Sequence, residues 1–278
     1  MLPSEQILLS VAAAVLLGAG SSAAVHRAKV HHEKPSIALW LWPILVILLN
    51  GYVLAARALA AEDLRHMFVG RFDVTLLFAT TLTVVAAYAQ HFSSIRGLDG
   101  FLLPVATVFQ VFAFAQLEEP LLRYDTASWF IVHQISMIVA ATFLVCGGAG
   151  GGVYLLLLRA LRRKQPSPLF GHLAPLESWE RFGRWNLVIG FALLSFGILT
   201  GMCEAYQSVR AAKATRQAWA TDKFILACFL MWALYALAIG ASVFVPRFRG
   251  RRAAQLALGT GALLVFIFLV VQNVSSVH

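Results

Sequence analysis

The chain has 278 residues, of which 60% are hydrophobic and only 13% are charged. Soluble domains carry about a quarter charged residues, and a soluble fold of this composition would expose large apolar patches, so the composition excludes an ordinary soluble globular protein. The net charge of +9 is shared with soluble nucleic-acid binders. Here, however, the basic residues stand between apolar runs, which is typical of membrane topology signals and predicts the lipid bilayer, and no nucleic acid, as the partner.

Apolar runs along the chain predict an all-α polytopic membrane bundle of about eight transmembrane helices in one domain over residues 1–278. The first run lacks a basic leader and a small-residue cleavage site, so we expect a retained helix and no signal peptide. In chain order the predicted spans are 6–25, 37–57, 73–91, 101–117, 130–158, 185–204, 223–245 and 253–274.

The loops between these spans differ in charge. The odd-numbered loops hold most of the 22 Lys and Arg residues, with a cluster at 159–164 in the fifth loop, whereas the even-numbered loops hold fewer, Arg57 and Arg71 among them. Cytoplasmic loops are enriched in Lys and Arg, so the odd loops are predicted to face the cytoplasm and both termini the outer, periplasmic side. The sixth loop, with four basic residues, is the local exception.

Cysteine spacing and short motifs narrow the possible chemistry. All three cysteines fall inside apolar runs and no C-x-x-C is present, which argues against disulfides, zinc sites and covalently attached haem. No Walker motif, G-x-G-x-x-G, H-E-x-x-H or G-x-S-x-G occurs either. The sequence therefore predicts a protein that is not an enzyme.

Two histidines fall on the predicted outer face. His133 lies at the start of the fifth helix and His278 is the last residue. Two imidazoles on one face can supply both axial ligands of a six-coordinate haem iron. The alternative is that each is an interfacial histidine with its polar tip in water.

The sixth loop has the composition of a membrane-interface segment, in which aromatic and apolar residues alternate with basic ones. Its basic side chains would pair with haem propionates, and Trp219 would lie against a porphyrin face. The alternative is an aromatic anchor with lipid-phosphate-binding cations. The basic residues concerned are Arg210, Lys213 and Arg216.

A glycine-rich run, Gly147-Gly-Ala-Gly-Gly-Gly152, interrupts the fifth predicted helix. Small residues let helix backbones approach closely in lipid, so packing is one interpretation. A kink or a slot for a flat ligand is the other.

An ordered set of features runs from residue 130 to the C-terminus. His133 lies at the start of a predicted helix that ends in Tyr154–Lys164. Further matching motifs follow at 174–181, 189–201, 219–235 and 249–254. This half of the chain resembles the cytochrome c assembly transmembrane family, which includes CcsA-type haem handlers and HemX-like proteins. The first four helices agree with that family in number and placement.

The resemblance implies an outward-facing haem b site, built from two histidines that flank a tryptophan-rich loop ending in Trp-x-Trp-Asp-Pro-Lys. His133 and His278 match the two histidines, and Trp219 and Asp222 match the end of the loop. The chain departs from the pattern at Thr221, where a tryptophan is expected, and the proline is missing. The HemX-like branch tolerates such a reduced loop.

The resulting expectation is a haem-handling protein of the bacterial inner membrane, related to cytochrome c biogenesis, that binds or transfers haem b without bond chemistry. Its expected partners are other cytochrome c assembly proteins or a membrane complex. Two alternatives remain open. One is an accessory or structural subunit of a larger, respiratory-type membrane complex with a vestigial haem site, and the other is a membrane regulator of haem biosynthesis acting through the basic fifth loop.

Overall fold

The computed structural model describes residues 11–20, 38–61, 68, 70–91, 97–114, 116, 128–163, 174–210, 223–245 and 250–271, and the regular structure in these ranges is helical. The shortest helix is Val11–Gly20. The others are α2 (Ala38–Ala60), α3 (Arg71–His91), α4 (Asp99–Phe114), α5 (Ser128–Arg163), α6 (Leu176–Arg210), α8 (Lys223–Phe244) and α9 (Arg251–Val271).

Each predicted span overlaps one of these helices. Within the described ranges, 6 helices are long and apolar enough to cross a membrane, while Val11–Gly20 and α4 are apolar but shorter. The predicted all-α, multi-pass membrane architecture is therefore confirmed. The exact number of spans and the side on which the termini lie stay predictions.

The helices α5 and α6 are longer than their predicted spans. They contain 36 and 35 residues, about 54 and 52 Å at 1.5 Å per residue, whereas the hydrocarbon core of a bilayer is about 30 Å thick. The extra first turns of α6 carry the i,i+4 pairs Glu177–Arg181 and Glu180–Arg184, with N–O distances of 3.5 and 3.0 Å. Such pairs support a helix in water, so polar residues expected in a loop extend α6 instead.

The chain divides into two compact units. Unit 1 contains residues 1–125 and 159–175, and unit 2 contains residues 126–158 and 176–278. Each is described by itself below, and the single domain expected from the sequence stays a prediction.

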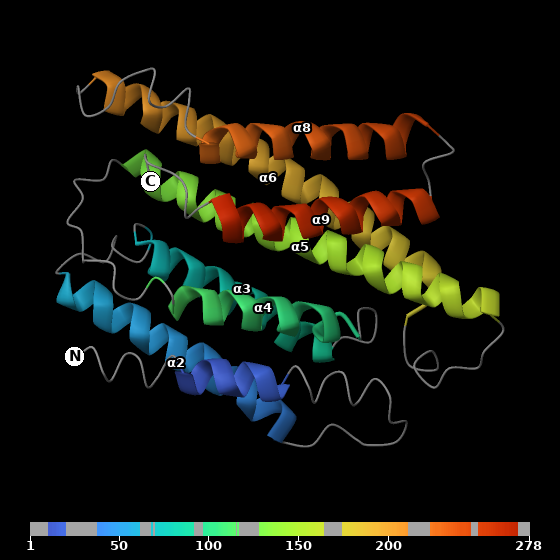
Figure 1. Ribbon diagram of the computed structural model, residues 1–278, viewed down its shortest axis with the longest axis horizontal. Coiled ribbons are helices and arrows are strands. Elements are labelled where there is room, and N and C mark those ends of the chain that lie inside the picture. Colours follow the sequence, from blue (N-terminus) through green and yellow to red (C-terminus); the bar gives the residue numbers. More distant parts are fainter. Residues whose placement is uncertain are drawn as a thin grey trace. The chain divides into compact units, whose positions relative to one another are not determined.

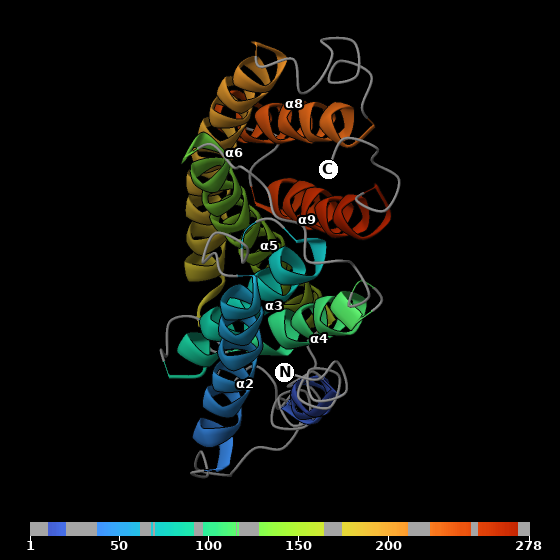
Figure 2. The same cartoon turned by 90° about the vertical axis from the view of Figure 1, so that its left-hand side faces the viewer.

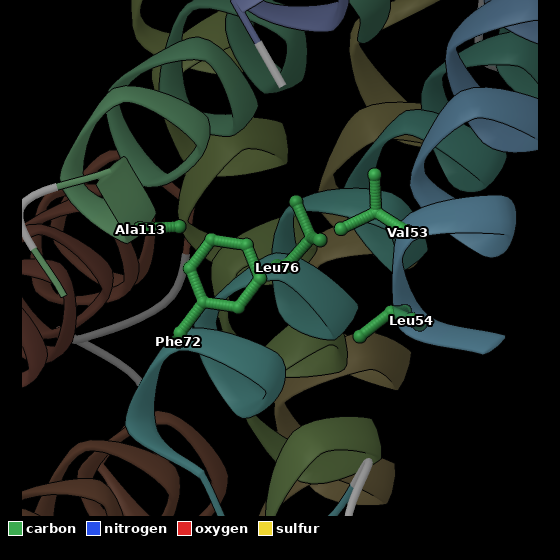
Figure 3. Packing of buried hydrophobic residues seen from close by; sticks show 5 residues of the cluster. All are labelled: Val53, Leu54, Phe72, Leu76 and Ala113. Carbon is green, nitrogen blue, oxygen red and sulfur yellow. The ribbon is translucent and has the colours of Figure 1, made fainter. Parts of the chain in front are cut away.

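In unit 1, α3 packs between α2 and α4 (Figure 1). Figure 3 shows a cluster of apolar side chains from α2, α3 and α4, which converge near the end of α2, the start of α3 and the end of α4. All of them are buried, with Phe72 and Leu76 projecting from the middle helix. The remaining members of this apolar cluster are Val53, Leu54 and Ala113.

Polar side chains also cross between the helices of unit 1. Asn50 of α2 and Gln110 of α4 exchange amide hydrogen bonds of 3.0 and 3.1 Å, and the Asn50 amide also donates to the Thr80 hydroxyl at 3.0 Å. Nearer one end, Arg57 Nε donates to Asp73 Oδ1 at 2.8 Å, with side chains only 6% and 0% exposed. Arg57, assigned to a loop from the sequence, therefore lies inside the last turn of α2.

Unit 2 contains α5 up to Leu158 together with α6, α8 and α9 (Figure 2). Here α5 approaches its neighbours through glycines. A Cβ added at Gly148 would lie 3.1 Å from Gly261 Cα of α9, and one at Gly151 would lie 2.7 Å from the carbonyl oxygen of Ala254. Only small residues permit such backbone contacts, so the packing interpretation of the glycine run is confirmed.

Candidate functional site

His133 lies in the second turn of α5, half-buried, with its ring against α6. Its Nδ1 atom is 2.7 Å from the carbonyl oxygen of Gly197. A carbonyl can only accept a hydrogen bond, so Nδ1 carries the proton. In the neutral ring this leaves the lone pair of Nε2 available to bind a metal ion.

The space for this ring depends on a second glycine, one turn further along α6. A Cβ at Gly201 would lie 2.9 Å from both Nδ1 and Cε1 of His133. The Nδ1–Cε1 edge of the imidazole therefore rests on the bare backbone of α6.

Polar side chains surround the same contact. The Thr200 hydroxyl lies 2.9 Å from the carbonyl oxygen of Gly197, which also accepts the bond from His133. On α5, the Ser136 hydroxyl donates to the His133 carbonyl at 2.8 Å. A carbonyl oxygen has two lone pairs, so Gly197 can serve both Thr200 and His133.

The neighbouring helices of unit 2 place their ends near the level of His133. The α6–α8 register is set by Trp232, whose indole N–H donates to Ser195 Oγ at 2.9 Å and whose ring stacks on Phe191. Because the two helices are antiparallel, this register brings Lys223, where α8 begins, to the level of Glu204, one turn beyond Gly201. The last residues of α6 and the first residues of α8 thus lie at the end of unit 2 that carries His133.

Of the residues predicted to form the haem site, two are described. His133 contacts α6 as above, and Arg210 is exposed at the last residue of α6, about 13 Å along the helix from Gly201. The other predicted residues lie outside the described ranges, so their roles stay predictions. They are His278, Trp219, Lys213, Arg216 and Asp222.

Sequence reasoning missed the two residues that seat the imidazole, Gly197 and Gly201. Their spacing, Gly-x-x-x-Gly, is the small-residue motif of close helix packing in membranes. The motif is therefore visible in the sequence, but the partner that it meets on α5 is not.

Comparison with known proteins gives one match. A family model described as "Cytochrome C assembly protein" matches residues 53–278. The matched range begins within α2, includes all of unit 2, and contains both His133 and His278. No curated protein and no solved structure matches the chain.

Proposed function

Because the chain belongs to the cytochrome c assembly protein family, we propose that it handles haem at the end of unit 2 that carries His133. Family membership supports a role related to cytochrome c biogenesis, and the long apolar helices make the chain a multi-pass membrane protein in contact with lipid. Haem handling is the more specific step, and it rests on the geometry of His133.

The observation that carries the proposal is the hydrogen bond from His133 Nδ1 to Gly197 O. Histidines that bind metals almost always donate the other ring N–H to a carbonyl, a carboxylate or water, which fixes the tautomer and raises the basicity of the ligating nitrogen. The half-buried ring of His133 meets this requirement without bound haem. It could therefore hold haem b through its free Nε2 atom, and haem would supply the iron that is carried, not a reaction catalysed by this chain.

We expect His278 to act as the second ligand, and the length of the chain that joins it to α9 allows this. Antiparallel α5 and α9 meet where Gly148 touches Gly261. From that level, His133 lies about 22 Å along α5 and Val271 about 15 Å along α9. A chain of seven residues, such as 272–278, can span up to about 24 Å. This exceeds the separation of about 7 Å along the helix axes between Val271 and His133.

The segment between α6 and α8 would hold the rest of the macrocycle. The helix ends that flank it lie at the end of unit 2 near His133, and it contains Trp219 and Asp222, which match the loop of the family. Arg210, Lys213 and Arg216 would donate charge-assisted hydrogen bonds to the haem propionates. We expect this end to face the periplasm of a bacterial inner membrane, and we expect the chain to bind and pass on haem without making or breaking covalent bonds.

The test is a visible absorption spectrum of the full chain, purified in mild detergent from cells supplied with haem. We expect a Soret band that is lost in the His133→Ala, His278→Ala double variant and kept in His172→Ala, which removes an imidazole from the predicted cytoplasmic side. In His133→Gly, added imidazole should restore part of the band. No Soret band in the wild type, or an unchanged band in the double variant, would overturn the proposal.

A second candidate function is an accessory subunit of a larger membrane complex. Thr221 stands where the family has a tryptophan, which is the change expected if the haem loop has lost its role while the fold has been kept. Stoichiometric partner proteins that co-purify with a haem-free chain would favour this candidate over haem handling.

A further inference from the structure

Glycines form a stripe along the face of α6 that meets α5. Gly183, Gly190 and Gly197 recur at intervals of seven residues, and Gly201 follows one turn later. A spacing of seven keeps one face of a helix against its partner when the two supercoil left-handedly. The stripe is therefore the seam between the two longest helices of the structure.

The partners along this seam change from one end to the other. A Cβ at Gly183 would approach the backbones of Gly147 and Gly151, and one at Gly190 would lie 2.8 Å from the Leu144 side chain. At Gly197 the nearest atom is Met137 Sδ, at 2.7 Å. These three glycines let the helices approach.

Gly201 differs from the rest because its partner is the ring of His133, at 2.9 Å from the position of an added Cβ. An imidazole can yield only by rotating, and rotation would carry Nδ1 away from the Gly197 carbonyl, 2.7 Å distant. The ring is thus held by a hydrogen bond on one turn of α6 and by the missing side chain on the next.

We propose that Gly197 and Gly201 are positioning residues of the haem site, which fix the tautomer and the rotamer of His133 before haem arrives. This inference rests on the proposed function and adds the source of its geometry. Gly197 acts through its backbone carbonyl, which every amino acid has. Gly201 acts because it has no Cβ, and glycine is the one amino acid without a Cβ. Orientation of the His133 imidazole therefore requires glycine at position 201 but not at position 197.

The predicted consequence is a preorganised ligand. Removing a group that orients a metal-binding histidine costs about 10–100-fold in metal affinity. Gly201→Ala should therefore speed the loss of haem to excess apomyoglobin by about 10–100-fold.

Gly190→Ala is the matched control, because it adds the same methyl group to the same seam. Its Cβ would lie 2.8 Å from Leu144, at least as close as that of Gly201 to His133, but about 16 Å away along α6. We expect Gly190→Ala to lower thermal stability as much as Gly201→Ala does, or more, and to leave the rate of haem loss within about twofold of the wild type, since the groups that orient His133 are untouched.

A readout without haem tests the seating directly. In protein labelled with 15N-histidine, the signal that disappears in His133→Ala identifies this residue. We expect it to report the Nδ1–H tautomer in the haem-free wild type and in Gly190→Ala, and to lose that tautomer preference in Gly201→Ala.

The outcomes distinguish the positioning role of the glycines from haem handling itself. If the wild type binds haem and Gly201→Ala loses it no faster than Gly190→Ala does, the positioning role is overturned and the proposed function stands. If the tautomer is unchanged in Gly201→Ala, the positioning role also fails. If the wild type binds no haem, the proposed function itself fails.

Discussion

In unit 1, side chains that donate and accept hydrogen bonds cross from helix to helix, whereas in unit 2 the helix backbones themselves meet at glycines. Both arrangements solve one problem, since lipid offers little hydrophobic force to drive helices together. The polar side chains of unit 1 hydrogen-bond to one another, as in Asn50, Gln110 and Thr80. Few of their donors and acceptors are therefore available to a ligand. Along the glycine seam of α5 and α6 a polar side chain, His133, donates to a backbone carbonyl, and among the residues that the structure describes its Nε2 atom is not engaged in that bond.

The largest change in stability is expected when the ion pair of unit 1 is removed. Asp73→Ala would leave the buried Arg57 without its partner, which costs about 3–5 kcal/mol for a buried pair. Thermal unfolding of the purified chain in mild detergent measures the loss. Glu180→Ala is the control, because its partner Arg184 is 59% exposed and an exposed pair contributes about 0–1 kcal/mol. Equal losses in the two variants would show that unit 1 does not depend on this pair.

The next effect concerns glycine packing in unit 2. Gly261→Ala places a methyl group 3.0 Å from Gly148 Cα, a backbone atom that cannot rotate away, and such overpacking costs about 1–3 kcal/mol. Gly259→Ala, on the same helix, meets nothing within 4 Å, and we expect it to be neutral or stabilising by up to about 1 kcal/mol because alanine favours helix. If both variants unfold at the wild-type temperature, the close approach of α5 and α9 is not what stabilises unit 2.

A smaller effect is expected from the amide pair of unit 1. Hydrogen bonds between membrane helices contribute about 0.6 kcal/mol on average and up to about 1.7 kcal/mol. Asn50→Leu and Gln110→Leu should each destabilise the chain by about 1–2 kcal/mol, because each leaves its partner amide buried and unpaired. The double variant should lose about 0.5–1.5 kcal/mol less than the sum, since both amides go together. Strict additivity in this double-mutant cycle would contradict the pairing.

The smallest effect is predicted for Trp232 in unit 2. Trp232→Phe removes the hydrogen bond to Ser195 but keeps an aromatic ring against Phe191, so we expect a loss of less than about 0.6 kcal/mol. Ser195→Ala should have no further effect in the Trp232→Phe background. A loss several times larger would mean that unit 2, too, is stabilised by polar side chains.

The apolar runs of the sequence were enough to predict that the fold is helical and roughly where each helix lies. All of the predicted spans overlap helices, because a long apolar segment in lipid must satisfy its own backbone. The ends were less predictable. Glu177 and Arg181 are charged and were assigned to a loop, yet at i,i+4 spacing they pair and lengthen α6.

Charges inside the bundle were misplaced for a related reason. Arg57 was counted with a loop because an arginine is costly in lipid. Its position in the core of unit 1 depends on Asp73, and that pairing requires the register of α2 against α3, which composition does not contain.

The candidate site was predictable only as far as His133 itself. Its place at the start of the fifth helix follows from the apolar pattern. The bond to Gly197 and the clearance at Gly201 follow from the register of α5 against α6, in which His133 and Gly197 are 64 positions apart in the sequence. The Gly-x-x-x-Gly spacing indicated which face of α6 a neighbouring helix would contact. It did not indicate that the contacting residue would be His133.

The interval of seven residues between the glycines of the α6 seam also limits how this chain can change in length. One residue inserted between Gly190 and Gly197 would turn everything after it by about 100° and advance it by about 1.5 Å. Gly201 would then face away from α5, and His133 would meet a side chain where it now meets bare backbone. A whole heptad would keep Gly201 on the face toward α5 but would move it about 10.5 Å along α6, away from His133. Insertions and deletions in this stretch are therefore tolerable only when α5 gains or loses the matching residues, so the two helices can lengthen in evolution only together.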